Sequence, residues 1–277
     1  MGIITISRTH GSGGTTFARE VAKHLGYSYI DRTFINNECR ESDRHIRSFG
    51  IDGHTAPGLH DVTRELMTDA NFYKASFVAN ILDHSLQDNA VMTGMGAGII
   101  LAGMGNTINL RIVRLMEERI RAIAQVKSIP YDDAFDLVEK MDEGKREFIT
   151  RYFDADVGDP SLYHAVVNSS YASLEEAVGI LAENAQRHFT PIHAEETERV
   201  LKGRLLEKRA EMLLFHLGMG HCSGKVLFRA GAEDSLSVAG VVRNEAEKNR
   251  LLQALAKNTQ IRDITDALET GVFESTV

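Results

Sequence analysis

A glycine-rich segment near the amino terminus has the residue types that bind phosphate. It reads Gly11-Ser12-Gly13-Gly14 followed by two threonines, and it joins an apolar run to an amphipathic stretch. Glycines let backbone N–H groups approach an anion, and the amino terminus of the following helix adds partial positive charge. We therefore predict that this loop holds a chain of phosphate groups.

The segment departs from the common phosphate-loop pattern G-x-x-x-x-G-K-[ST]. When Gly13 is placed on the second glycine, Arg8 takes the first glycine, Gly14 the lysine and Thr15 the hydroxyl residue. The hydroxyl of Thr15, or of Thr16, is then the expected Mg²⁺ ligand, while the lysine ammonium is missing. The planar, multidentate guanidinium of Arg8 is the candidate substitute, and a structural salt bridge beneath the loop is the alternative.

The elements around the loop predict an α/β fold with a parallel sheet and helices on both faces, because strands alternate with helices along the chain. Continuous apolar runs predict buried strands over residues 2–7, 90–94, 107–113 and 163–168. Helical spacing predicts helices over residues 15–25, 74–87, 116–126, 131–153 and 173–188. We expect the stretch 131–153 to form two helices and residues 44–60 to form a mobile or ligand-covering loop.

The pattern changes near residue 190, where a long charged amphipathic helix is predicted over residues 195–217. Two short strands, a helix and a last strand follow, over residues 225–229, 235–242, 244–257 and 261–268. This order, αββαβ, is typical of a small α+β domain. We therefore expect one domain over residues 1–190 and a second over residues 191–277.

Composition excludes several classes of protein. The chain has 277 residues and a net charge of −8, which argues against broad nucleic-acid binding. Cys39 and Cys222 are far apart, and the histidines lack metal-ligand spacing, which argues against a disulfide framework or a histidine metal site. No apolar run approaches the roughly 20 residues of a membrane span, and no signal segment precedes the first strand. The expectation is a cytoplasmic protein that binds small molecules.

The glycine loop and three later segments together resemble the cytidylate kinase-like family of P-loop nucleoside monophosphate kinases. The later segments are GYSYIDR at 26–32, MTGMGA at 92–97, and KREFITRYF at 145–153 with DPSLYH at 159–164 and VVN at 166–168. They span about residues 1–188 in the family's order, and this family branch itself uses a loop without lysine. The αββαβ tail resembles a BON module, mainly through residues 236–242 and the helix that follows.

The resemblance implies where the acceptor is bound. Asp31 and Arg32 end the second segment, where the family positions the acceptor's phosphate or sugar; an N-cap role for Asp31 is the alternative. Gly94 and Gly96 belong to a Gly-x-Gly near the acceptor phosphate. Met95 stands between them, where the family commonly has an arginine, and a thioether cannot pair with phosphate.

The resemblance also implies a lid whose arginines close over the phosphates. Arg146 and Arg151 are the candidates on the stretch before Asp159, and Arg119 is a further candidate on the helix after residues 107–113. Arg121 is a weaker one. The alternative is that these are ordinary solvated side chains on helix surfaces.

These observations lead to one hypothesis and two rivals. The hypothesis is a kinase that transfers a phosphoryl group from Mg²⁺-bound ATP to a CMP- or dCMP-like acceptor, with Arg8, Arg146, Arg151 and Asp31 as catalytic residues and a regulatory C-terminal module. The first rival is a nucleotide-binding sensor with weak or no transfer, coupled to that module. The second rival is a structural adaptor in which the glycine loop binds no ligand. Whether the C-terminal helix or module forms a homo-oligomer is left open.

Overall fold

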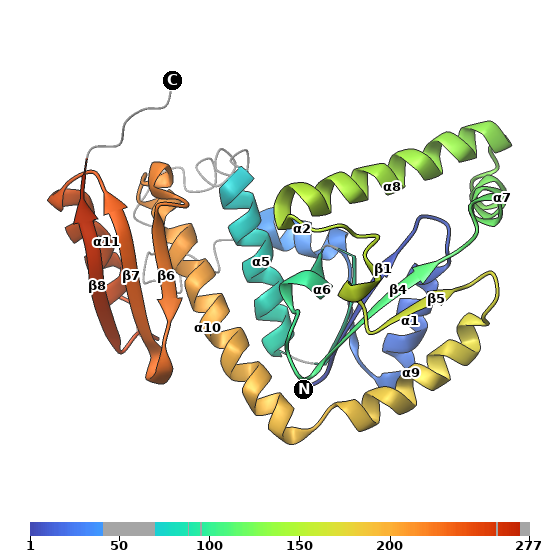
Figure 1. The fold of residues 1–277 in the computed structure, drawn as a ribbon, viewed down its shortest axis with the longest axis horizontal. Helices are drawn as coiled ribbons and strands as arrows, with labels where there is room; N and C mark the ends of the chain where they lie inside the picture. The colour runs from blue at the N-terminus through green and yellow to red at the C-terminus, as the bar shows by residue number, and fades with distance from the viewer. Residues whose placement is uncertain (41–69, 88, 95, 259, 272–277) are drawn as a thin grey trace. The chain divides into compact units, whose positions relative to one another are not determined.

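The computed structural model describes residues 1–40, 70–87, 89–94, 96–258 and 260–271 (Figure 1). These residues form two compact units. The first contains Met1–Phe34 and His84–Glu198, and the second contains the described residues of Ile35–Asp83 and Arg199–Val277. The predicted loop at 44–60 and Met95 lie outside the described residues.

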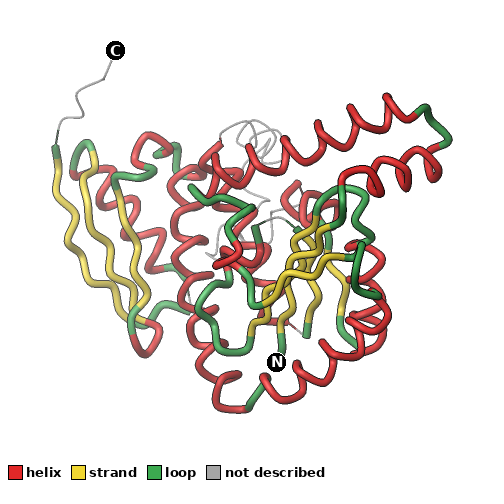
Figure 2. The backbone as a smooth tube through the Cα atoms, turned by 45° about the vertical axis from the view of Figure 1, so that its right-hand side comes forward, coloured by secondary structure: helices red, strands yellow, loops and turns green. Residues whose placement is uncertain are grey.

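The first unit is built on a parallel sheet of five strands in the order β2-β3-β1-β4-β5 (Figure 2, yellow). The strands are β1 (Ile3–Arg8), β2 (Ser28–Ile30), β3 (Ala90–Thr93), β4 (Thr107–Val113) and β5 (Ala165–Asn168). In the central register, Ile4 pairs with Val91 on one side and with Ile108 on the other. The predicted α/β class is confirmed, and all five carboxyl ends meet at one edge of the sheet.

Helices connect these strands. Those within the first unit are α1 (Gly14–Leu25), α6 (Ala97–Ile100), α7 (Met116–Lys127), α8 (Tyr131–Phe153) and α9 (Leu174–His188). Three others, α2 (Arg32–Arg40), α5 (Ala70–Gln87) and α10 (Pro191–His216), contribute residues to both units. α1 and α9 pack on one face of the sheet, where Phe17 and Leu181 join a core with Ile4 and Leu110.

Two predictions about these elements were wrong. α8 is one helix of 23 residues and not two (Figure 1). Gly144 is its only internal glycine, and a single glycine costs a helix about 1 kcal/mol, too little to break it. β5 is not a buried strand: it lies at the edge of the sheet, where Val166 is 45% exposed, because an edge strand has a neighbour on one side only.

The second unit contains a separate three-stranded sheet in the order β6-β7-β8. Its strands are β6 (Val226–Ala230), β7 (Ser235–Val242) and β8 (Asp263–Thr270), and α11 (Glu245–Ala256) joins the last two. β6 pairs antiparallel with β7, and β7 pairs parallel with β8. This confirms the predicted αββαβ order.

The second unit has its own core. Leu213 and Leu214 of α10 pack with Phe228 of β6, Leu236 of β7 and Leu251 of α11. Leu206 of α10 also belongs to this core. Leu201, Leu205 and Met212 of the same helix are buried as well, whereas Ile192 is 78% exposed. Among the described residues, no helix is long and apolar enough to cross a membrane.

Candidate functional site

The predicted phosphate loop forms a tight turn between β1 and α1. Gly11 and Gly13 both have a φ of +79°, a conformation that favours glycine. Glycine is also required for space, because a Cβ on Gly14 would lie 2.6 Å from the Cβ of Arg8. α1 begins at Gly14, and its first-turn N–H groups have no acceptor within the helix. The loop therefore presents a helix amino terminus to the carboxyl edge of the sheet, where an anion is favourable.

Hydrogen bonds hold this loop in shape. The Ser12 hydroxyl donates to the carbonyl oxygen of Thr9 at 2.8 Å, and the Thr9 amide donates to the carbonyl of Ile112 at 3.1 Å. The Ser169 hydroxyl donates to the carbonyl oxygen of Ser12 at 2.8 Å. Because β4 and the segment after β5 both anchor the loop, its amides are positioned before any ligand binds.

Arg8 ends β1 and lies against the loop. Its Nε donates to Thr15 Oγ1 at 3.4 Å, and a Cβ on Gly94 would lie 2.2 Å from its Nη1. Burial lowers the pKa of the Arg8 guanidinium, and the nearby Tyr29 and Asp31 oppose that shift. Within the described part of the chain, Arg8 forms no ion pair with a carboxylate, so the structural salt bridge considered as the alternative is absent there. Its cationic group lies between the phosphate loop and the end of β3.

A cavity of about 590 Å³ is lined by Arg8 and Thr9, where β1 leads into the loop, whereas residues 11–16 are not part of its lining. Its lining contains seven basic side chains, Arg8, Arg32, Arg111, Arg119, Lys140, Lys145 and Arg146, and two acidic ones, Asp142 and Asp156. The chain as a whole has a net charge of −8. The excess of basic groups is therefore local to this cavity, and it favours an anionic ligand such as a phosphate ester.

Asp142 of α8 connects this cavity to the phosphate loop. One of its carboxylate oxygens accepts from the His10 amide at 2.7 Å and from Lys145 Nζ at 3.1 Å, and the other accepts from Arg119. Arg119 also donates to the carbonyl oxygen of His10 at 3.1 Å, and Lys145 donates to the carbonyl oxygen of Arg8 at 3.3 Å. Helices α7 and α8 thus hold both ends of the peptide segment that enters the loop.

Burial and charge act together on these groups. Burial alone raises the pKa of Asp142, but the His10 amide and the cations Lys145 and Arg119 lower it overall, so the carboxylate stays ionised. Burial lowers the pKa of Lys145, and the Asp142 carboxylate opposes that shift. Burial, together with Lys145, lowers the pKa of His10, which keeps its imidazole neutral near pH 7.

The predicted acceptor residues lie near the other side of the cavity. Asp31 accepts hydrogen bonds from the amides of Thr33 at 3.0 Å and Phe34 at 3.1 Å, so it caps α2 as the alternative predicted. The Arg32 guanidinium lies over the ring of Phe148, 4.5 Å from its centroid, and lines the cavity.

Gly94 and Gly96 also line the cavity, and both have positive φ values near +70°. Phe153 packs over Gly96, where a Cβ would lie 2.6 Å from the ring. No larger residue fits at either glycine without moving Arg8 or Phe153. Met95 lies outside the described residues.

The predicted lid arginines occupy different positions relative to the cavity. Arg146 is exposed and lines the cavity, whereas Arg151 lies over Tyr152, 5.8 Å from its ring centroid, and is not part of the cavity lining. Arg119 is buried, and it donates a hydrogen bond to the carbonyl oxygen of His10 at the loop. Arg121 pairs with a glutamate one turn away on the surface of α7, with 69% of its side chain exposed.

Thr15 and Thr16 lie in the first turn of α1, and both offer hydroxyl oxygens of the kind that Mg²⁺ prefers. A hydroxyl oxygen has two acceptor lone pairs, so the bond from Arg8 to Thr15 leaves one for a metal. The donor set at this end of the loop therefore fits Mg²⁺ held mainly by phosphates and water.

The sequence patterns did not identify three residues of this site, Lys145, Asp142 and Arg111. Lys145 lies in the KREFITRYF segment, in which the resemblance points to Arg146 and Arg151 instead, and Asp142 precedes that segment. Their three-residue spacing on a helix, next to an arginine, was the one local signal for a charged cluster. Arg111 of β4 is the third; it donates to Ser7 Oγ at 3.1 Å inside the cavity.

Comparison with known proteins adds independent information. A family model described as "Cytidylate kinase-like family" matches residues 3–171. A cytidylate kinase from Thermoplasma acidophilum is 29% identical over 182 residues, which cover 65% of this chain and 89% of the relative. A cytidylate kinase from Staphylothermus marinus is 23% identical over 183 residues, which cover 66% and 96% respectively.

A crystal structure of an uncharacterized protein from Eubacterium ventriosum covers 67% of this chain and 99% of its own, with 17% identity and a TM-score of 0.49. The family match over residues 3–171 includes the phosphate loop and the residues that line the cavity, and it ends before the second sheet.

Proposed function

Because this chain belongs to the cytidylate kinase-like family, we propose that it transfers the γ-phosphoryl group of ATP to a nucleoside monophosphate. The observation that carries the proposal is the cavity beside the phosphate loop, with seven basic side chains in a chain of net charge −8. Phosphoryl transfer needs aligned donor and acceptor groups and positive charge around the moving phosphoryl group, and little covalent help from the protein.

The phosphate loop supplies the donor site in this proposal. Amides of residues 11–16 bind the β- and γ-phosphates, and Arg8 lies at the end of β1 beside them. Lys145 supplies the ammonium group that the loop sequence lacks: its Nζ is 3.3 Å from the carbonyl oxygen of Arg8 and is oriented by Asp142. The hydroxyl of Thr15 would hold Mg²⁺, which would neutralise charge on the donor phosphates.

The acceptor enters from the side of Gly94 and Gly96, with Arg32 and Asp31 at its edge. An anionic oxygen of its phosphate attacks the γ-phosphorus, the bond from that phosphorus to the bridging oxygen breaks, and ADP leaves with the electron pair. No proton has to be removed from an attacking phosphate oxygen, so the site needs no general base. Arg146 and Arg8 stabilise the charge on the transferred group.

The acceptor we propose is CMP or dCMP, in keeping with the relatives named cytidylate kinase. We further propose that residues 1–190 carry this activity and that residues 191–277 form a BON-like regulatory module. The αββαβ order and the separate core of the second unit support an independent role for that module.

The test is ATP-dependent phosphorylation of a panel of nucleoside monophosphates with Mg²⁺. We expect turnover on CMP or dCMP, and a loss of about 10²- to 10³-fold in kcat for Lys145→Met and for Arg146→Ala, because each removes one charged donor from the transition state. Arg121→Ala is the matched control, since Arg121 is an exposed arginine on α7 outside the cavity.

Two outcomes would count against the proposal. ATP binding without turnover on any acceptor would favour the nucleotide sensor, and the absence of both binding and turnover would favour the adaptor. Thermal melts of each variant separate a loss of chemistry from a loss of folding.

A further inference from the structure

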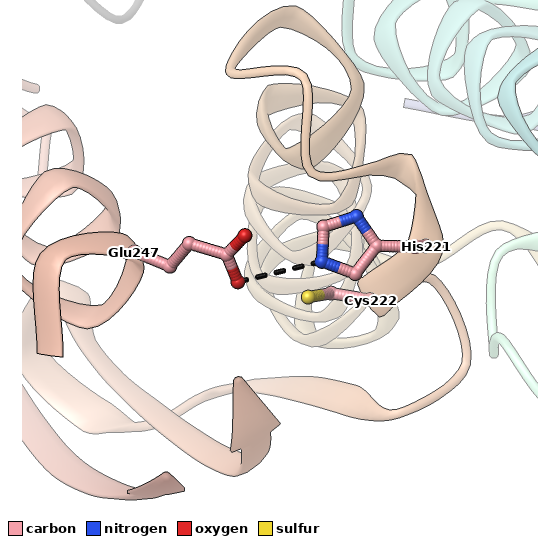
Figure 3. Close-up of side chains that lie close together, drawn as sticks. All are labelled: His221, Cys222 and Glu247. Carbon is pink, nitrogen blue, oxygen red and sulfur yellow. Dashed lines mark hydrogen bonds and ion pairs between the residues drawn. The ribbon is translucent and has the colours of Figure 1, made fainter. Parts of the chain in front are cut away.

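Three side chains of different chemistry meet in the second unit, away from the phosphate loop. His221 and Cys222 belong to the short turn at Gly220–Cys222, and Glu247 belongs to the first turn of α11 (Figure 3). Their ligand atoms all lie within 4.8 Å of one another, and His221 Nε2 is 3.4 Å from Glu247 Oε2. Within the described ranges, this is the one group of three such side chains close enough to share an ion.

The spacing of these atoms fits a tetrahedral metal centre. Zinc is bound by thiolate, imidazole and carboxylate groups, and nitrogen and oxygen ligands at about 2.0–2.2 Å lie roughly 3.3 Å apart when the geometry is tetrahedral. The observed 3.4 Å between His221 and Glu247 matches that separation. Cys222 Sγ lies within 4.8 Å of the other two ligand atoms, so a modest movement would bring it to the zinc–sulfur distance of about 2.3 Å.

Helix capping accounts for only part of this arrangement. Asn244 caps α11 by accepting from the Glu247 amide at 3.0 Å, and Glu247 Oε2 accepts from the Arg243 amide at 3.1 Å. This reciprocal pair is complete without a histidine or a cysteine. The Arg243 amide uses one lone pair of Oε2, and the second lone pair of this oxygen, which lies 3.4 Å from His221 Nε2, can bind a metal. His221 forms a hydrogen bond with Glu247 in addition to the cap, and Cys222 Sγ lies within 4.8 Å of both ligand atoms, a position that capping does not explain.

We propose that His221, Cys222 and Glu247 bind a zinc-class divalent cation, with a fourth position open to water or to an exchangeable ligand. The thiolate and the carboxylate together carry two negative charges, which balance the cation, and the imidazole binds in its neutral form. As the sulfur–metal bond forms, the thiol proton of Cys222 passes to solvent, and no oxidant or reductant is needed. Mg²⁺ and Ca²⁺ are disfavoured because sulfur and nitrogen are poor ligands for them.

Such a centre joins two segments that are distant in sequence. Cys222 follows α10 and is fully buried in the core of the second unit, while Glu247 lies 25 residues later on α11. A cation held between them ties the turn after α10 to the start of α11. Because metal binding to a folded site is linked to folding, this unit becomes sensitive to the concentration of the metal. The inference does not depend on kinase activity in the first unit.

The test is a cobalt titration of the full-length chain, stripped of metal and kept reduced with a phosphine that contains no thiol. We expect a thiolate-to-cobalt charge-transfer band and the visible bands of tetrahedral Co²⁺, at one ion per chain, and we expect Zn²⁺ to displace them. Titrated Zn²⁺ should also raise the melting temperature. Absence of the charge-transfer band would overturn the proposal.

Variants decide which residues bind the ion. Glu247→Gln keeps an acceptor for the Arg243 amide, and His221→Gln changes a partly exposed side chain, so both are expected to fold. Each should weaken Co²⁺ binding at least 10-fold, and Cys222→Ser should abolish the charge-transfer band. Cys39→Ser, the other buried cysteine, is the matched control and should leave the band unchanged. A band that survives Cys222→Ser, or that disappears with Cys39→Ser, would contradict the assignment.

Discussion

At the scale of single residues, Asp142 is the common partner of the groups around the phosphate loop. Its carboxylate is 13% exposed and accepts from the His10 amide, Lys145 and Arg119. Removing the charge leaves two cations close together with no carboxylate between them. Breaking a buried ion pair in this way costs about 3 kcal/mol or more.

We therefore expect Asp142→Asn to lower the free energy of unfolding by about 3 kcal/mol at neutral pH. The folded state lowers the pKa of Asp142 below its ordinary value of 3.8. The stabilisation is therefore complete above that value and is lost as the pH falls through the lower folded pKa. Urea unfolding of both proteins should show a difference that is constant near neutrality and shrinks at the acid end of the range.

Asp136→Asn is the matched control, because Asp136 is exposed on the same helix. We expect it to change stability by less than about 0.5 kcal/mol at every pH. An Asp142→Asn effect as small as that of Asp136→Asn would show that the network around the loop contributes nothing to folding.

At the scale of elements, the turn between β1 and α1 depends on glycine in a way that helix interiors do not. Gly11 has a φ of +79°, and a Cβ there would lie 3.0 Å from the carbonyl oxygen of Arg119. In contrast, a Cβ on Gly179 of α9 meets nothing within 4 Å. The same substitution therefore has opposite consequences at the two positions.

We expect Gly11→Ala to cost about 1–2 kcal/mol of stability through its strained backbone, and to weaken ATP binding at least about 10-fold because the loop amides move. Gly179→Ala should instead raise stability by about 0.5–1 kcal/mol and leave ATP binding unchanged. Thermal melts and calorimetric titration with ATP measure both quantities. Equal ATP affinity in the Gly11→Ala variant and the wild type would argue that the loop does not bind phosphate.

At the scale of the whole molecule, the balance of charge differs between the chain and its cavity. The chain has a net charge of −8, which repels an anionic nucleotide at long range, while the cavity lining contains seven basic groups and two acidic ones. At physiological ionic strength, the Debye length of about 8 Å screens the distant charges more than those in the cavity. Local attraction therefore decides whether the nucleotide binds.

Mg²⁺-ATP at about 100 times its Kd should stabilise the folded chain by about 2.7 kcal/mol, because the ligand binds the folded state only. At roughly 2–4 °C per kcal/mol for a protein of this size, the melting temperature should rise by about 5–10 °C. Adenosine, which lacks phosphates, is the control for base and ribose contacts. A rise of equal size with adenosine would contradict a site dominated by phosphate.

The sequence by itself determined the local features of this protein. The glycine loop, its position between a strand and a helix, the α/β class and the αββαβ order all follow from patterns within a few residues. The N-cap alternative for Asp31 is of the same kind, since a carboxylate bonds amides two and three residues ahead. Local hydrogen bonding and side-chain periodicity decide such features, so no tertiary contact is needed to read them.

Only the tertiary structure decided which charges meet at the site. Lys145 is 137 residues from Arg8, whose carbonyl oxygen it contacts, and Arg119 reaches His10 across 109 residues. Arg146 and Arg151 look equivalent in the sequence, yet only Arg146 lines the cavity, because their spacing of five places them on different sides of one continuous helix. His221, Cys222 and Glu247 came together for the same reason. Packing between elements that are distant in sequence determines these contacts, and the spacing of residues along the chain does not predict them.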